Sequence, residues 1–192
     1  PKLYFAEDEL QAIKKTFRDD VHGQGKKLLA PILIHPGMTG HTLNWPIQNY
    51  LNLVVEIEKK IPKTYTYIIS YTASDEKFIS PFKTSLQTID FALPKTDFDE
   101  FLKRIVLFNG GTRGLRNYSG VISFAHLFIG PSTGPTHVAA ALGIPVVTIF
   151  SPIKAQSEMR WRPQSLDAGK VVVHVPDVIC GESVECAGTN CP

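Results

Sequence analysis

The sequence has few cysteines, no long apolar run and almost no net charge. The longest apolar stretch, Val138 to Phe150, is interrupted by Gly143 and Pro145 and is too short to span a bilayer. Twenty Lys and Arg residues nearly balance eighteen Asp and Glu residues, so the composition does not favour a nucleic-acid partner. Acidic residues occupy positions 7–9, where a secretory signal would carry basic and apolar residues. We therefore expect no transmembrane segment, no nucleic-acid partner and no export signal.

All three cysteines lie within the last thirteen residues, at Cys180, Cys186 and Cys191. Their spacing matches no standard zinc motif and favours reduced thiols in an irregular tail over residues 180–192 of a cytoplasmic protein. The alternative is a disulfide or a metal cluster completed by residues outside the printed sequence. We expect neither a metal ion nor a cofactor.

Apolar residues make up 43% of the 192-residue chain, which is enough for the core of one domain. Continuous apolar segments alternate with segments of helical spacing, a pattern typical of a parallel sheet covered on both faces. Because Pro31 lacks an N–H, pairing of the first strand is expected to begin near Ile32, and Pro81 is expected to interrupt its helix. The predicted strands cover residues 28–34, 64–70, 104–108, 127–129, 146–149 and 170–175, and the predicted helices cover residues 7–17, 46–61, 75–89, 115–126 and 135–142. The sequence predicts a single α/β domain over residues 1–192, with a Rossmann-like parallel sheet of about six strands and helices on both faces.

The most informative segment is Phe128 to Ser151, FIGPSTGPTHVAAALGIPVVTIFS. A short apolar strand leads into a turn of small and hydroxyl-bearing residues, and Gly134 and Pro135 stand where the next helix should begin. The first N–H groups of such a helix are unpaired and its dipole is positive there, which suits a phosphate. His137 lies on the first turn and adds a donor or a charge.

A second turn of the same kind follows the first predicted strand. That strand closes with His35-Pro36-Gly37, and the loop up to residue 44 offers Thr39, Gly40, His41 and Thr42, which can hold a pyrophosphate. Ligands bind at the carboxyl ends of strands in such sheets, so both turns should share one site. The alternative is a polar surface loop. His35 itself is interpreted as bracing the strand end, with a catalytic role as the alternative.

These two segments resemble glycosyltransferase family 9, the bacterial lipopolysaccharide heptosyltransferases. The likeness is carried by the run from Thr133 to Pro145 and by the His35-Pro36-Gly37 turn followed by Trp45-Pro46. It extends over roughly residues 1 to 190 and corresponds to the carboxyl-terminal half of the family's two-domain GT-B architecture. Many family members carry Asp at the position of Ser132, and Lys directly before the Trp-Pro pair.

The resemblance implies an inverting glycosyltransferase that moves a sugar, usually heptose from ADP-heptose, onto a lipid-linked lipopolysaccharide core acceptor. The nucleotide sugar would bind this domain. The acceptor surface and the general base would lie in an amino-terminal domain absent from this chain, so no catalytic residue is expected here. The implied setting is the cytoplasm, including peripheral association with the inner face of the inner membrane.

The candidate site residues divide into two groups. The donor diphosphate group is Thr39, Gly40, His41, Thr42, Ser132, Thr133, Gly134, Pro135, Thr136 and His137. The nucleoside group is Glu76, Gly111 and Arg113, for which a solvated helix terminus and ordinary turn chemistry are the alternatives. Two other functions remain open. One is a nucleotide-binding half-domain without catalysis, and the other is a further GT-B sugar-nucleotide enzyme such as an epimerase, for which the sequence shows no convincing carboxylate pair.

Overall fold

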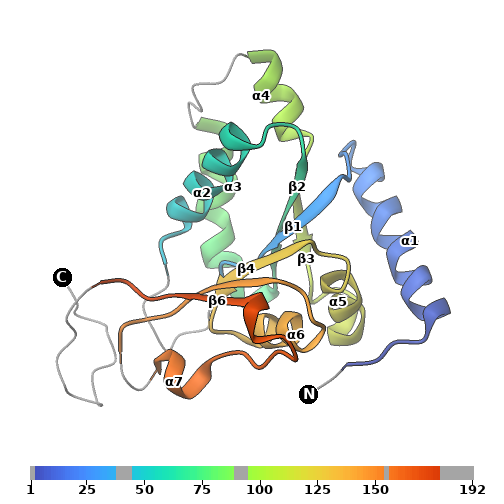
Figure 1. Cartoon of the computed structure of the whole chain (residues 1–192). Helices are drawn as coiled ribbons and strands as arrows, with labels where there is room; N and C mark the ends of the chain where they lie inside the picture. Colours follow the sequence, from blue (N-terminus) through green and yellow to red (C-terminus); the bar gives the residue numbers. More distant parts are fainter. Residues whose placement is uncertain (1–2, 38–44, 89–94, 154–155, 178–192) are drawn as a thin grey trace.

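The computed structural model describes residues 3–37, 45–88, 95–153 and 156–177, and these residues form one six-stranded sheet (Figure 1). Every strand pair is parallel, and the strand order is β3-β2-β1-β4-β5-β6. The strands are β1 (Ala30–Ile34), β2 (Tyr65–Tyr71), β3 (Ile105–Asn109), β4 (Leu127–Pro131), β5 (Val146–Ile149) and β6 (Val171–His174). The predicted Rossmann-like parallel α/β fold is confirmed. Its chain order reverses between β1 and β4, the position where such sheets open a crevice for a ligand.

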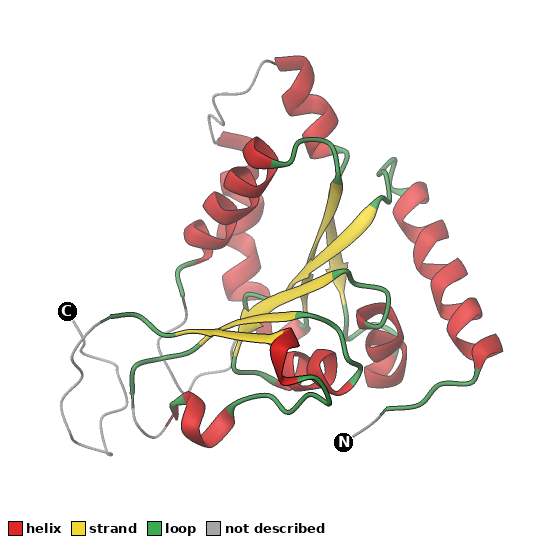
Figure 2. Cartoon of the chain, viewed as in Figure 1, coloured by secondary structure: helices red, strands yellow, loops and turns green. Residues whose placement is uncertain are grey.

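Helices connect successive strands and cover both faces of the sheet. They are α1 (Glu7–Gly23), α2 (Ile47–Lys60), α3 (Glu76–Thr88), α4 (Lys95–Leu102), α5 (Gly114–Ile122), α6 (Gly134–Ala141) and α7 (Glu158–Trp161). Short 3₁₀ turns at residues 73–75 and 168–170 precede α3 and β6. Figure 2 shows the strands in yellow passing between two groups of helices, with α2 and α3 on one side and α1 and α5 on the other.

Each face of the sheet has its own apolar core. The α1–α5–α6 face buries Phe17, Val21, Tyr118, Ile122 and Phe128. The α2–α3 face buries Tyr50, Leu51, Tyr67, Phe82 and Phe101. Full burial of a large apolar side chain contributes roughly 1.5–3 kcal/mol, so these two layers supply most of the driving force for folding. The amphipathic spacing of the helices follows directly from this arrangement.

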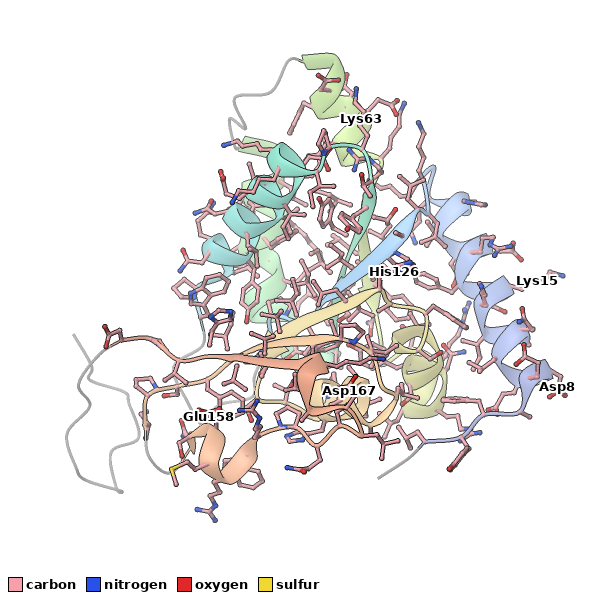
Figure 3. The ribbon with its side chains drawn as sticks, viewed as in Figure 1. Asp8, Lys15, Lys63, His126, Glu158 and Asp167 are labelled. Carbon is pink, nitrogen blue, oxygen red and sulfur yellow. The ribbon has the colours of Figure 1, made fainter. Side chains whose placement is uncertain are left out.

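α1 packs closely against α5 because Gly120 has no side chain. A Cβ atom at Gly120 would lie 2.6 Å from Cδ1 of Ile13. Arg116 on α5 pairs with Glu9 at 2.6 Å. The opposite face of α1 is solvent-exposed, and Figure 3 shows Asp8 and Lys15 pointing away from the domain. Gly120 thus serves the contact between the two helices.

The prediction that pairing of β1 begins near Ile32 is confirmed on the β4 side, where Ile32 pairs with Leu127. On the β2 side pairing begins earlier, with Ala30 opposite Tyr65 and Pro31 opposite Thr66. In a central strand successive N–H groups face opposite neighbours, and β4 begins only opposite Ile32, so the missing N–H costs no ladder bond. The carbonyl of Pro31 still accepts from the His126 N–H at 2.8 Å.

Pro81 does not break its helix. α3 continues from Glu76 to Thr88 with Pro81 inside it. Ile79 and Phe82, on either side of the proline, are almost completely buried, so packing on the sheet outweighs the lost hydrogen bond. One boundary also differs from the prediction: α5 ends at Ile122, and the Ser123 Oγ just after it donates to the Gly120 carbonyl at 2.6 Å. In addition, α4 was not predicted.

A buried ion pair joins α2 to the amino end of β3. Arg104 and Glu58 form two contacts, Nη2 to Oε1 at 2.6 Å and Nη1 to Oε2 at 2.9 Å. The Lys63 N–H and the Tyr67 hydroxyl also donate to Glu58, at 2.9 and 3.2 Å. Burial favours the neutral acid, but these donors outweigh it, so the pKa of Glu58 lies below its ordinary value. This pair lies near the amino ends of the strands, whereas the predicted site lies at their carboxyl ends.

Candidate functional site at the carboxyl edge of the sheet

The two predicted ligand turns begin side by side. β1 and β4 pair in register up to Ile34 opposite Ile129, and the His35 N–H donates to the Ile129 carbonyl at 2.9 Å. A Cβ atom at Gly130 would lie 2.8 Å from the His35 carbonyl oxygen, so the two backbones are in direct contact. The prediction that both turns share one edge is confirmed for the residues from His35 to Gly37 and from Gly130 to His137. Thr39, Gly40, His41 and Thr42 lie outside the described residues.

The turn after β4 presents the amino end of α6. Thr133 is the N-cap residue with extended backbone, and Gly134 and Pro135 open the helix. Ser132, Thr133 and Pro135 are partly exposed and Gly134 is exposed, with open space where a Cβ atom would stand. The start of α6 is therefore open to solvent at Gly134, and the unpaired N–H groups at the start of a helix are the donors that an anion site requires.

Thr136 differs from its neighbours in this turn. Its side chain is fully buried, and Oγ1 donates to the Pro131 carbonyl at 2.5 Å. The Thr133 hydroxyl oxygen lies 3.2 Å from Thr136 Oγ1. In this structure the Thr136 side chain therefore holds the turn together, which leaves its backbone N–H as the group that could reach a ligand.

His137 lies on the first turn of α6 and is half-buried. Its backbone N–H donates to the Thr133 carbonyl at 3.2 Å. Burial lowers the pKa of His137 below its ordinary value, so the free domain holds a neutral imidazole at pH 7. An anion at the amino end of α6 would favour the protonated ring.

The three predicted nucleoside residues follow β2 and β3, which are adjacent strands paired up to Tyr71 and Asn109. Glu76 begins α3, is exposed, and pairs with Lys83 at 2.9 Å. The Gly111 N–H donates to the Asn109 side chain at 3.0 Å. Arg113 contacts Asp20 through two guanidinium nitrogens, at 2.7 and 3.2 Å, beside a groove of about 470 Å³ between α1 and β3. The structure thus places these residues along the same edge as the turns, with Glu76 and Arg113 already in ion pairs.

A buried polar cluster beneath this edge was not predicted. His35 Nδ1 lies 3.2 Å from both the Ser70 and the Tyr118 hydroxyl oxygens, which lie 2.7 Å from each other. His35 Nε2 lies 3.8 Å from Asp75 Oδ2, and Asp75 accepts from the Thr72 N–H at 2.8 Å and the Thr72 hydroxyl at 2.6 Å. All of these side chains except that of Thr72 are nearly inaccessible. The prediction that His35 braces the strand end agrees with this geometry.

The cluster joins elements that are far apart in the sequence. The Ser70 hydroxyl donates to the Ile34 carbonyl at 3.2 Å. A Cβ atom at Gly37 would lie 2.4 Å from the Asp75 carboxylate carbon, so this carboxylate packs directly under the turn after β1. Burial lowers the pKa of His35, and Asp75 and Ser70 act in the opposite direction without cancelling it. Burial likewise raises the pKa of the Tyr118 hydroxyl.

The described residues show neither a metal-binding cluster nor a membrane-spanning helix. No group of three or more His, Cys, Asp or Glu side chains among them is placed to hold a metal ion. None of the helices in that part of the chain has both the length and the apolar character needed to cross a membrane.

Comparison with known proteins agrees with this fold. The chain superimposes on Escherichia coli ADP-heptose LPS heptosyltransferase II with a TM-score of 0.62 and 21% identity, covering 95% of this chain and 46% of the other. A family 9 glycosyltransferase from Veillonella parvula gives a TM-score of 0.62 at 12% identity, covering 91% and 42%. E. coli heptosyltransferase WaaC with ADP-2-deoxy-2-fluoro heptose gives 0.51 at 14% identity, covering 77% and 37%.

Sequence comparison adds a family. The profile of glycosyltransferase family 9 (heptosyltransferase) matches residues 111–187. A provisionally named glycosyltransferase of Haemophilus influenzae is 31% identical over 64 residues, which is 33% of this chain and 18% of that protein. The chain thus spans less than half the length of these relatives.

The fold is that of one Rossmann-like half of a GT-B heptosyltransferase structure. Residues 111–187, which include the whole turn at the amino end of α6, carry the sequence pattern of glycosyltransferase family 9. The resemblance predicted from the sequence is therefore confirmed for this segment.

Proposed function

We propose that the chain is the nucleotide-sugar-binding domain of an inverting glycosyltransferase, with ADP-heptose as donor and a lipid-linked lipopolysaccharide core saccharide as acceptor. The observation that carries the proposal is the contact between the two turns at the sheet's reversal point. The amino end of α6 opens beside the end of β1 there, and the family match includes the α6 turn.

The chemistry requires this domain to hold a diphosphate while it becomes a leaving group. An acceptor hydroxyl attacks the anomeric carbon, the bond from that carbon to the diphosphate oxygen breaks, and negative charge builds up on the diphosphate. Preorganised N–H donors stabilise such charge without reorganisation, and loss of one donor typically costs about 3–4 kcal/mol of transition-state stabilisation. The N–H groups of Gly134 and Thr136, the hydroxyls of Ser132 and Thr133, and His137 have the required chemistry. The base that takes the acceptor's proton would come from a preceding domain.

The nucleoside would lie along the same edge, above the ends of β2 and β3. Glu76 can accept from ribose hydroxyls, and the backbone near Gly111 can meet the edge of a base. Because Glu76 and Arg113 are already paired with Lys83 and Asp20, nucleoside binding would act through exposed ion pairs of modest strength. Selection of ADP over UDP is therefore expected to come from the backbone near Gly111 and from the fit of the base.

A charge placed at Gly134 tests the diphosphate site. Gly134 is exposed and has open space where a Cβ atom would stand, so Gly134→Asp should fold. A carboxylate in the first turn interacts favourably with the α6 dipole, so thermal stability should hold or rise. The same charge repels a diphosphate, and we expect the affinity for ADP, measured by calorimetry, to fall at least tenfold. Lys15→Gln is the matched control, since it makes the same change in net charge on the outer face of α1 (Figure 3).

The result separates two functions. If the chain binds neither ADP nor UDP at millimolar concentration, the nucleotide-binding proposal is wrong. If it binds ADP but the full-length protein transfers no sugar from ADP-heptose to a core saccharide, the domain is a nucleotide-binding half-domain without transfer activity. Action on a lipid-linked acceptor at the cytoplasmic face of the inner membrane is part of the same proposal.

A further inference from the structure

We propose that Asp75 and His35 are positioning residues, which set the geometry of the two ligand turns from below without touching the ligand. The inference rests on the proposed nucleotide-binding function for its consequence, but its structural content stands on the buried cluster alone. Both side chains are only 4% exposed and lie under the carboxyl edge of the sheet.

The first step of the argument is connectivity. His35 is joined through its backbone to β4, and through its ring to Ser70 on β2 and Tyr118 on α5. Asp75 is joined to Thr72 in the turn after β2 and packs against Gly37 in the turn after β1. One cluster therefore connects the ends of β1, β2 and β4 with the helix that follows β3.

The second step is the proton arrangement on His35. The Asp75 carboxylate can only accept, so the Nε2 atom that faces it at 3.8 Å should carry the proton of a neutral ring. Nδ1 is then an acceptor. Each hydroxyl has one proton, so Tyr118 can donate to Ser70 across 2.7 Å while Ser70 donates to Nδ1 at 3.2 Å, with the Ile34 carbonyl as the competing acceptor. The opposite tautomer would place an unprotonated nitrogen toward the carboxylate. Asp75 thus selects one tautomer, and that tautomer fixes how Tyr118 and Ser70 orient.

The third step is the effect on the turns. Gly37 has no room for a side chain above Asp75, and Gly130 has none beside the His35 carbonyl. The backbone of each turn therefore contacts a residue of the cluster directly, Gly37 at the Asp75 carboxylate and Gly130 at the His35 carbonyl. A shift of the Asp75 carboxylate or of the His35 ring would move Gly37 and Gly130 relative to each other, and with Gly130 the amino end of α6. Misplacement of donors by about 1 Å is enough to weaken a preorganised site greatly.

The test uses Asp75→Asn, which keeps the side-chain shape and removes the charge. We expect faster amide hydrogen exchange at His35 and Gly37 and at Gly130, Ser132 and Thr133, with little change at the β2–β3 pairing. We also expect the ring ¹⁵N shifts of His35 to show loss of the single Nε2–H tautomer. Affinity for ADP should fall about tenfold at a temperature at which the variant is fully folded. Tyr118→Phe removes only the hydroxyl that faces Nδ1 and should change the same readouts in the same direction, which keeps the test available if Asp75→Asn does not fold.

Glu58→Gln is the matched control, because it neutralises another buried carboxylate at the opposite edge of the sheet. It should lower the melting temperature but leave the turns' exchange and the ADP affinity unchanged. Unchanged exchange and an unchanged His35 tautomer in both cluster variants would overturn the inference. So would a rise in exchange that is uniform across the sheet, which would indicate a general stabilising role. Local exchange changes in a protein that binds no nucleoside diphosphate would instead support the positioning role and disprove the proposed function.

Discussion

The carbonyl oxygen of His35 lies 2.8 Å from the point where a Cβ atom on Gly130 would stand. Real Cβ atoms essentially never approach a backbone atom so closely, so only glycine lets β4 pass the end of β1 at this point. The distance between the two turns is therefore determined by a missing side chain.

Replacement of Gly130 by Ala should separate these backbones. Because the obstructing atom is backbone oxygen, the strand itself must move, and the free energy of unfolding should fall by about 1–3 kcal/mol, a typical cost of overpacking. Chemical denaturation measures this change. Gly23→Ala is the control, since Gly23 lies in α1 with open space around it and should gain stability by up to about 1 kcal/mol. Equal behaviour of the two variants would show that the His35 contact does not limit residue size.

Replacement of His137 by Ala should weaken ADP binding by about 1–3 kcal/mol, as expected for loss of a charge-assisted hydrogen bond. The melting temperature should change little, because the ring is only half-buried and donates to no other residue that the structure describes. Calorimetry and thermal unfolding on one variant give both quantities. The reverse pattern, a clear loss of stability with unchanged affinity, would identify His137 as a packing residue.

ADP binding should also depend on pH through His137. Burial lowers its pKa in the free domain, and a bound diphosphate favours the protonated ring, so binding takes up a proton. Affinity should therefore rise as the pH falls from about 7.5 toward 6. His137→Gln supplies the control, because the pH dependence that it retains belongs to ADP itself and to other groups. Identical slopes in the two proteins would contradict a role for His137.

The Glu58–Arg104 pair should be important for stability and irrelevant to binding. Glu58→Ala leaves a buried guanidinium without its partner, which typically costs about 3–5 kcal/mol, whereas ADP affinity should not change. Because the pKa of Glu58 is lowered on folding, its contribution is complete above the unfolded value of about 4.3 and is lost as the pH falls through the folded value. Acid unfolding of the wild type and of Glu58→Gln checks this window, and the variant should lose less stability within it.

His35 should give a second and separate pH window. Its pKa is lower in the folded than in the unfolded chain, so the unfolded chain binds the proton more readily. The free energy of unfolding should therefore fall as the pH drops below about 6.5, the unperturbed histidine value. The melting temperature between pH 7.5 and 5 measures the effect, and His35→Gln should flatten it. A slope that persists unchanged in the variant would assign the effect to other groups.

The sheet was predictable because its strands are buried on both faces and appear as continuous apolar runs. The strand over Val146–Ile149 was predicted with its observed limits. Helix ends were predicted less well, since α1 continues to Gly23, six residues beyond the prediction, along the seam with α5. α4, over Lys95–Leu102, is a short helix that gave no recognised signal. Proline was weighed too heavily at Pro81, where packing decides the outcome, and at Pro31 it limits the pairing of β1 on the β4 side only.

The site was predictable only where its signal is local. The turn from Gly130 to His137 is contiguous in sequence and was identified from glycine, proline and hydroxyl residues. The cluster of His35, Ser70, Asp75 and Tyr118 was not, because its members come from four elements and meet only when the sheet forms. Tyr118 lies in the predicted helix over residues 115–126, whose apolar spacing indicates a buried ring but gives no sign of the contacts of its hydroxyl. The role of Gly37 likewise depends on Asp75, which is distant in the sequence.

The ladder between β1 and β4 has a consequence for folding. It pairs three residues of each strand, Ile32–Ile34 with Leu127–Ile129, whereas β1–β2 and β2–β3 each pair five. The strands that it joins are also the most distant in sequence among neighbours in the sheet, so its closure carries the largest loop entropy. The sheet thus consists of two three-stranded halves that are joined by its shortest ladder. A ligand bound to both turns at the end of the β1–β4 ladder would hold the two halves together and lower the rate at which they separate during unfolding.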